Sequence, residues 1–98
     1  MTDKNQQQFV QLVVEPEFEI DTAQPQRIRR IDDGFEPTIG QSPQGYTITT
    51  LNGHTHNIHR LVVLQFIPGD DTEHKIKVDH VSSIKTDNSL TNLRWVAP

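Results

Sequence analysis

The sequence predicts a small α+β domain that contains a β-hairpin and a short buried helix. Short runs alternate polar with apolar side chains, as half-buried strands do, and the turn-forming pair Asn52-Gly53 separates two of these runs. One continuous apolar segment, which ends at Pro68-Gly69, predicts the helix. A chain of 98 residues buries only a modest core, so we expect one small domain.

The N-terminal part of the chain is predicted to consist of a tail followed by short strands and loops. Residues 1–8 are polar and Gln-rich, and we expect a disordered tail there. Residues 9–44 are expected to form a strand and loop segment. Its predicted strands lie within 9–14, 18–20 and 27–31, and its loops, rich in Pro, Gly and acidic residues, are 21–26 and 32–43.

The second part of the chain, residues 45–98, has a sharper pattern. Two alternating runs, 46–51 and 54–58, flank Asn52-Gly53, the pair that best tolerates the positive φ angles of a type I′ turn. They predict a hairpin. Residues 59–67 are too continuously apolar for an exposed strand, and they predict the buried helix.

A strand, a loop and a final strand are predicted after the helix. Residues 75–79 alternate, with Ile76 and Val78 on one face, so this strand would present Asp79 and His80 at its end. Residues 81–91 are rich in turn-forming side chains and predict a loop. Residues 92–96 predict the last strand.

Charge is unevenly distributed along the chain. The net charge is −4, which is unlike a protein that grips nucleic acid by bulk electrostatics. However, residues 1–44 hold eight acids and four bases, whereas residues 45–98 hold five of each and all five histidines. We therefore expect any phosphate-facing surface in the second part.

Cysteine and apolar content exclude several classes of protein. Without cysteine the chain has neither disulfides nor Cys-based zinc sites, so a metal would be held by His, Asp, Glu or Asn. No apolar run approaches the roughly 20 residues of a membrane span, and the N-terminus lacks a signal-peptide pattern. These features predict a soluble intracellular protein of the cytoplasm, nucleus or nucleoid.

Five blocks in the second part occur in the order and spacing of a known family. They are His59-Arg60-Leu61-Val62, Phe66-Ile67-Pro68, Val78-Asp79-His80, Lys85-Thr86-Asp87-Asn88 and Asn92-Leu93-Arg94-Trp95-Val96. Together they resemble the HNH homing endonucleases of phages and introns, the His-Me finger or ββα-metal nucleases. More weakly, 18–20 and 27–29 resemble the DNA-binding module often fused before such nucleases, although Pro25-Gln26 replaces its glycine.

This resemblance implies a fold, a reaction and a site. In the family, two strands joined by a loop and a following helix surround one divalent cation at the scissile phosphate. By resemblance His80 is the general base, Asp79 a metal ligand, and Asn92 the group that fixes the His80 ring or the phosphate. Such a base must be substantially neutral near pH 7, as histidine is, and a carboxylate suits magnesium, with manganese as the alternative. DNA is the implied partner, and an oligomer is not indicated.

The sequence departs from the family pattern in two places. The family carries its second metal ligand on the helix after the last strand, a position beyond Pro98, so we expect an incomplete ββα-metal motif whose final helix is lacking. In addition, Ser82-Ser83-Ile84 stands where the family has an Asp-Gly-Asn turn, so the loop path is expected to differ.

The remaining basic side chains and histidines have two interpretations each. They either contact the DNA backbone or are ordinary solvated charges. For His54, His56 and His59, a third interpretation is that they form a zinc site. The DNA-contact candidates are Arg27, Arg29, Arg30, His54, His56, Arg60, Lys75, Lys77, Lys85 and Arg94.

Three functions therefore remain open at this point. The first is a metal-dependent DNA endonuclease, or one piece of such an enzyme. The second is a degenerate HNH-like module that binds DNA without cutting it. The third is a protein-interaction domain that keeps the nuclease scaffold as its core, which the acidic N-terminal segment would suit.

Overall fold

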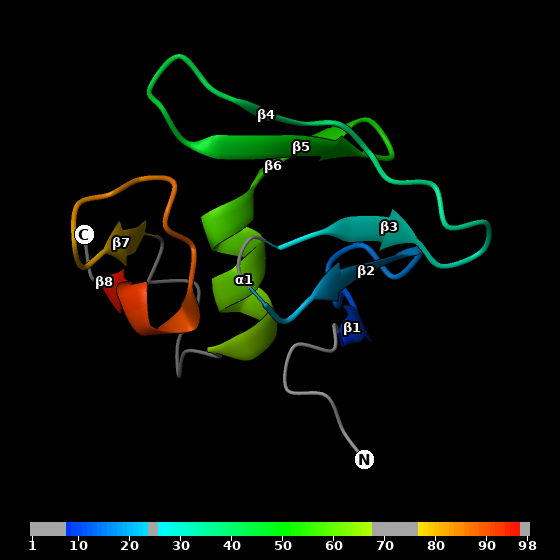
Figure 1. Ribbon diagram of the computed structural model, residues 1–98, viewed down its shortest axis with the longest axis horizontal. Helices are drawn as coiled ribbons and strands as arrows, with labels where there is room; N and C mark the ends of the chain where they lie inside the picture. Colours follow the sequence, from blue (N-terminus) through cyan, green and yellow to red (C-terminus); the bar gives the residue numbers. More distant parts are fainter. Residues whose placement is uncertain (1–7, 24–25, 68–76, 97–98) are drawn as a thin grey trace.

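Three small antiparallel sheets surround one α-helix (Figure 1). The computed structural model describes residues 8–23, 26–67 and 77–96. The helix lies between the N-terminal three-stranded sheet and the C-terminal two-stranded sheet, and the sheet that contains the hairpin leads into its first turn (Figure 1). Among the described residues, no helix combines the length and apolar character that a membrane crossing requires.

The first sheet is formed by short strands that pair in sequence order. Its strands are β1 (Phe9–Gln11), β2 (Phe18–Asp21) and β3 (Ile28–Arg30). Phe18 and Ile20 of β2 are buried, and Glu19 between them is half-buried, which is the alternation expected of a strand with one face on a core. All three strands lie within the ranges expected from the sequence, apart from Asp21 at the end of β2.

The second sheet contains the predicted hairpin. Its strands are β4 (Ile39–Gln41), β5 (Thr47–Leu51) and β6 (His54–Asn57). Asn52 and Gly53 have φ angles of 50° and 80°, as a type I′ turn requires, so the hairpin prediction is confirmed. β4 lies in a segment expected to be a loop, and it pairs with β5 on the other side of the expected boundary at residue 44.

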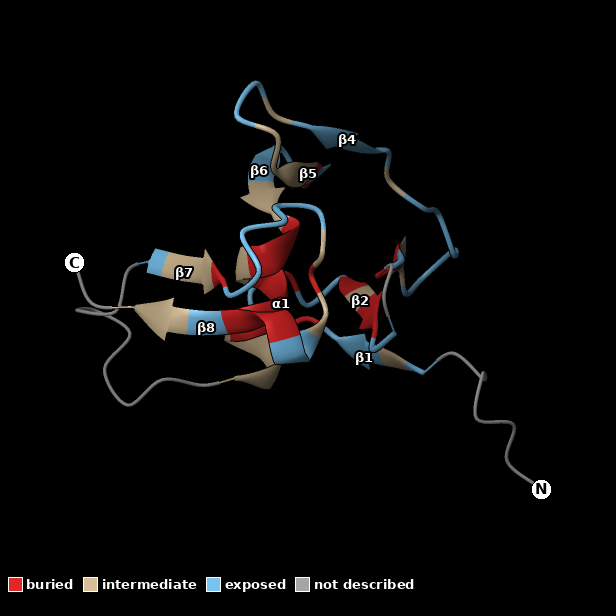
Figure 2. Cartoon of the chain, turned by 60° about the vertical axis from the view of Figure 1, so that its left-hand side comes forward, coloured by how far each residue is buried: buried red, intermediate tan, exposed pale blue. Residues whose placement is uncertain are grey.

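The helix α1 (Ile58–Phe66) forms the centre of the core (Figure 2). Its side chains at i, i+3 and i+4, Ile58, Leu61 and Val62, are almost fully buried, which confirms the predicted buried helix. Pro68 follows closely in the sequence, and a residue before proline disfavours the α conformation. Apolar side chains from all three sheets and from Leu12, the residue after β1, complete the core; the strand residues are Phe18, Ile20, Ile28, Leu51 and Leu93.

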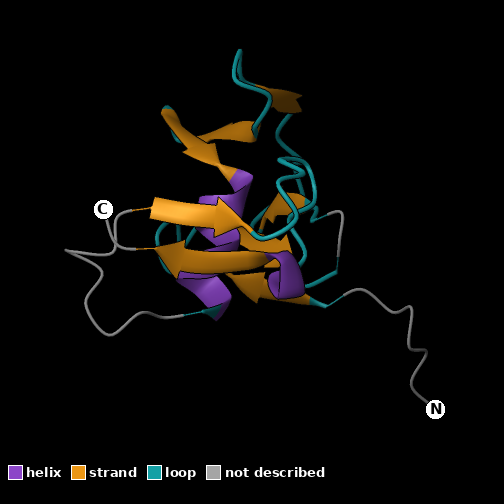
Figure 3. Ribbon diagram, turned by 90° about the vertical axis from the view of Figure 1, so that its left-hand side faces the viewer, coloured by secondary structure: helices purple, strands orange, loops and turns teal. Residues whose placement is uncertain are grey.

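The third sheet is formed by β7 (Lys77–His80) and β8 (Leu93–Val96), which lie side by side against α1 (Figure 3). A 3-10 helix, η1 (Leu90–Asn92), ends the connecting loop where no helix was predicted. The Trp95 indole N–H donates to the Ile67 carbonyl at 2.6 Å, so β8 is tied to the end of α1.

The small α+β fold predicted from the sequence is thus confirmed, with its hairpin, buried helix and final strand pair. Most of the expected N-terminal tail, Lys75 and Ile76 lie outside the described residues. The position of the family's helix after the last strand also falls beyond them, since their range ends at Val96.

Candidate active site

The loop between β7 and β8 is held in shape by Asn92. Its carboxamide oxygen accepts a hydrogen bond from the Ser82 backbone N–H, and its amide nitrogen donates to the Asp87 carbonyl, both at 2.9 Å. Ser83 has a φ angle of 68°, a left-handed conformation that glycine adopts more easily. Asn92 therefore spans the two ends of the loop that follows His80.

His80 lies at the end of β7 and is only 6% exposed. Its Nε2 is 2.8 Å from the carboxamide oxygen of Asn88. The family resemblance led us to expect Asn92 to fix either this ring or the phosphate, and in the structure Asn88 contacts the ring. The reason is the loop path: Asn92 turns its side chain into the loop backbone, whereas Asn88, buried at 3% exposure, faces the imidazole. A direct role of Asn92 in catalysis stays a prediction.

Two aromatic rings pack around His80. The Tyr46 ring stacks on it with centroids 5.9 Å apart, and the His59 ring meets it edge-on at 4.9 Å. Burial is the main cause that lowers the pKa of His59 to about 4, and the nearby His80 and Arg60 contribute to the same shift. His59 is therefore neutral at pH 7.

A cavity of about 180 Å³ opens beside His80. Its lining residues are Tyr46, Val78, Asp79, His80, Ser83 and Lys85. The Asp79 carboxylate oxygen Oδ2 lies 3.0 Å from Nε and 2.9 Å from Nη2 of Arg94, the residue opposite it on β8. Asp79 and His80 thus line the same cavity. The Asp79 carboxylate forms an ion pair with the Arg94 guanidinium.

Basic side chains surround this cavity. Lys85 lines it and lies over the Tyr46 ring, with its ammonium 5.0 Å from the ring centroid and 2.8 Å from the Gln44 carbonyl. Arg60 and Lys77 line an adjoining hollow of about 350 Å³ that shares Tyr46 with the first. Of the predicted DNA contacts, the fold brings together Arg60, Lys77, Lys85 and Arg94.

The other predicted contacts that fall within the described residues lie elsewhere, and each has an acidic partner. In the first sheet, Arg27 pairs with Glu36, Arg29 with Glu19 and Arg30 with Asp33. His54 and His56 both contact Glu15 and are separated from His59, so the three histidines do not form one group. Lys75 lies outside the described residues.

Gln26 is a residue whose role the sequence did not reveal. Its side-chain amide donates to the backbone carbonyl of Asn88 at 2.8 Å in a buried position. The residue shortly before β3 therefore braces the loop that holds His80. The only sequence signal was the departure from the family pattern at Pro25-Gln26.

Two curated proteins of Acanthamoeba polyphaga mimivirus are similar to the chain in sequence. The uncharacterized HNH endonuclease L247 is 41% identical over 46 residues, which are 47% of this chain and 12% of that protein. The uncharacterized HNH endonuclease L245 is 30% identical over 74 residues, which are 71% of this chain and 21% of that protein. No family model matches the sequence.

The fold is similar to that of the HNH homing endonuclease I-HmuI, whose solved structure concerns DNA binding and cleavage. The TM-score is 0.74 at 25% identity, and the likeness covers 92% of this chain and 52% of that one. The chain thus spans about half of this nuclease and less than a quarter of either viral relative. Similarity in both sequence and fold thus supports an HNH endonuclease family for this chain.

Proposed function

We propose that this chain carries the catalytic site of a metal-dependent DNA endonuclease, with His80 as the general base. The observation that supports this most directly is the hydrogen bond between His80 Nε2 and the Asn88 oxygen. A carboxamide oxygen only accepts hydrogen bonds, so Nε2 carries the hydrogen and Nδ1 keeps the lone pair. Nδ1 is then the atom that takes a proton from water.

The proposed reaction is the hydrolysis of one phosphodiester bond. A water oxygen attacks phosphorus while His80 Nδ1 accepts its proton, and the bond from phosphorus to the 3′ oxygen breaks. The 3′ oxygen gains a proton from solvent, and His80 later returns its own proton to solvent. Because His59 is neutral, it places no second positive charge beside the imidazolium that forms.

The residues at the cavity fit a hard divalent cation. Asp79 lines the same cavity as His80, and carboxylate oxygen suits Mg²⁺ or Mn²⁺. When bound, such an ion would stabilise the charge that develops on the phosphate and on the leaving oxygen. Arg94 contacts the same carboxylate, so the guanidinium and the cation would compete for Asp79.

The cations around the cavity support DNA as the substrate. Lys85 lies at the cavity itself, and Arg60 and Lys77 line the hollow beside it. Contacts of lysine and arginine with phosphate supply most of the sequence-independent affinity for DNA. This arrangement would place a phosphodiester next to His80 even though the net charge is −4.

Plasmid nicking in the presence of Mg²⁺ or Mn²⁺ tests the proposal. We expect the parent chain to nick supercoiled DNA and His80→Ala to lose roughly 10²- to 10⁴-fold of the rate, the usual contribution of a general base. Val81→Ala is the matched control, because Val81 is the next residue and is exposed. Equal rates for the parent and His80→Ala would refute His80 as the base.

The Asp79–Arg94 ion pair favours a second candidate function, an HNH-like module that binds DNA without cutting it. If Arg94 keeps Asp79 from the metal, the chain would bind DNA with strong salt dependence yet show no nicking with either ion. DNA binding that is absent, or that does not respond to salt, would instead support a protein-interaction domain.

A further inference from the structure

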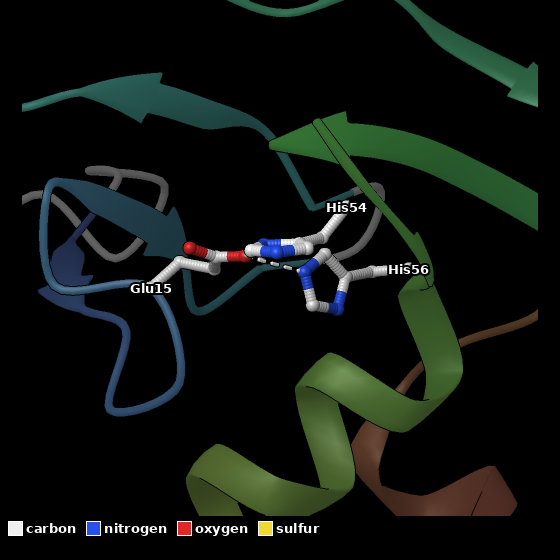
Figure 4. Close-up of side chains that lie close together, drawn as sticks. All are labelled: Glu15, His54 and His56. Atoms are coloured by element: carbon white, nitrogen blue, oxygen red, sulfur yellow. Dashed lines mark hydrogen bonds and ion pairs between the residues drawn. The ribbon is translucent and has the colours of Figure 1, made fainter. Parts of the chain in front are cut away.

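Glu15, His54 and His56 form a cluster outside the cavity at His80 (Figure 4). His54 Nδ1 and His56 Nε2 lie 3.1 Å and 2.7 Å from the same carboxylate oxygen, Glu15 Oε2. One ligand atom from each of the three side chains lies within 4.8 Å of the other two. Two imidazoles and one carboxylate thus converge on a single point.

We propose that this cluster is a binding site for a transition-metal cation, Zn²⁺ in the first place. Zinc bonds to imidazole nitrogen and carboxylate oxygen at about 2.0–2.2 Å, and a tetrahedral arrangement puts the ligand atoms about 3.3 Å apart. The separations of 2.7 and 3.1 Å between the ring nitrogens and the carboxylate oxygen are close to that spacing, and all three ligand atoms lie within 4.8 Å of one another. Nitrogen-rich ligands also favour zinc over magnesium.

The fold presents these three side chains before any ion arrives. His54 and His56 are two residues apart on β6, so they project from the same face of the strand. Glu15 lies in the connection between β1 and β2, where its carbonyl accepts the Phe18 backbone N–H at 2.9 Å. Its side chain is only 8% exposed, so the carboxylate is held in place rather than free in solvent.

The exposure of the two histidines leaves a coordination position open. The His56 side chain is 23% exposed, whereas that of His54 is 71% exposed. A cation held by three protein ligands would therefore complete its shell with water on the His54 side.

A cation here would connect two parts of the fold. Glu15 belongs to the first sheet region and the histidines to the hairpin, about forty residues further along the chain. Closing so long a loop restricts the unfolded chain, so the bound metal would stabilise the fold. This role is independent of the proposed nuclease reaction, because none of the three residues lines the cavity at His80.

Zinc binding by the full chain, without DNA, tests the proposal. After dialysis against micromolar Zn²⁺, we expect the parent to retain one equivalent and its Tm to rise by about 10 °C when zinc exceeds Kd a hundredfold. Glu15→Gln, His54→Gln and His56→Gln should each weaken binding at least tenfold, since altering even an outer-shell partner of a metal ligand costs roughly 10–100-fold.

Glu17→Gln is the matched control for Glu15→Gln. It removes the same charge two residues away, yet Glu17 contacts Asn52 and no histidine of the cluster. We expect it to bind zinc as the parent does. Retention of zinc by Glu15→Gln and by both histidine variants would overturn the proposal, as would a parent chain that binds none.

Ring-nitrogen NMR provides a readout that does not depend on variants folding. We expect zinc to shift the Nδ1 resonance of His54 and the Nε2 resonance of His56, the atoms that face Glu15. The His80 resonances should stay in place at one equivalent. Shifts confined to histidines other than His54 and His56 would assign the metal elsewhere and overturn the site.

Discussion

The first sheet and the corner formed by β7 and β8 use their basic side chains in opposite ways. In the sheet, Arg27, Arg29 and Arg30 each pair with a nearby carboxylate. In the corner, Arg94 is paired with Asp79, but Lys77 and Lys85 have no ion-pair partner within the part of the chain that the structure describes, and Lys85 lines the cavity. Charge counts along the sequence could not tell these paired arginines from the unpaired lysines. Whether a basic side chain is available to phosphate depends on whether it already has an acidic partner.

The two regions nevertheless meet at one buried hydrogen bond. Gln26, shortly before β3, donates to the backbone carbonyl of Asn88, whose side chain holds His80. The first sheet therefore supports the geometry of the corner even though its own arginines are neutralised.

Asn88→Ala should lower kcat for DNA nicking by roughly 10–100-fold, the usual cost of losing a group that orients a catalytic or metal-bound residue. Without the carboxamide, the Nε2 hydrogen of His80 is no longer fixed, so Nδ1 is the base in only part of the molecules. KM should change little, because Asn88 is buried and does not face DNA.

Asn88→Gln is the accompanying control, since a longer carboxamide can recover part of the hydrogen bond. Steady-state nicking kinetics of both variants would separate kcat from KM. A rise in KM with an unchanged kcat would mean that Asn88 acts in DNA binding and that His80 does not need it.

Acidification should destabilise the folded protein through His59, the residue of α1 whose ring packs against His80. Its folded-state pKa of about 4 lies below the unfolded value of about 6.5, so the unfolded chain binds more protons between these limits. The stability that this neutral histidine contributes is complete above pH 6.5 and is lost as pH falls toward 4, by on the order of 2 kcal/mol. Urea unfolding of the parent and His59→Leu at pH 7.5 and 5 measures it.

The leucine variant removes the titrating group while it keeps an apolar side chain in the same buried position. Its free energy of unfolding should therefore fall less between the two pH values. An equal fall in both proteins would assign the acid sensitivity to other groups, with the Glu15 cluster as the first to examine.

Local signals in the sequence predicted much of this fold, and long-range contacts account for what was missed. The turn at Asn52-Gly53 and the helix, predicted over 59–67 and observed over 58–66, depend on neighbours in the chain, and both were predicted. Strand β4, which contains a glycine and little apolar surface, exists because β5 offers backbone partners. No local pattern could reveal that pairing.

The candidate site was predictable only in part for the same reason. The neighbouring Asp79 and His80 were recognised as a pair, and both line one cavity. Whether Asn88 or Asn92 contacts His80 depends on the path of the loop, in which Ser83 takes a positive φ angle. Glu15 gave no signal at all, since it reaches His54 and His56 from a distant loop.

Removing a lysine from the corner should weaken DNA binding, whereas removing an arginine from the sheet should not. For every phosphate that a protein no longer neutralises, the slope of log K against log salt becomes shallower by about 0.9. We therefore expect Lys85→Ala and Lys77→Ala each to lower the slope by about that amount, and Arg30→Ala to leave it unchanged. Fluorescence anisotropy over a salt series measures the slopes.

The smallest expected effect is that of Asp33→Asn, which releases an arginine in the first sheet. Two bonds join Arg30 to Asp33, and they lower the pKa of Asp33 to about 2, so the pair stays ionised at any pH above that value. Because both side chains are solvent-exposed, stability should change little. DNA affinity at low salt should rise slightly, since a freed guanidinium can contact phosphate. An unchanged affinity would show that the first sheet lies away from DNA, and support of the loop through Gln26 would then be its main contribution to the site.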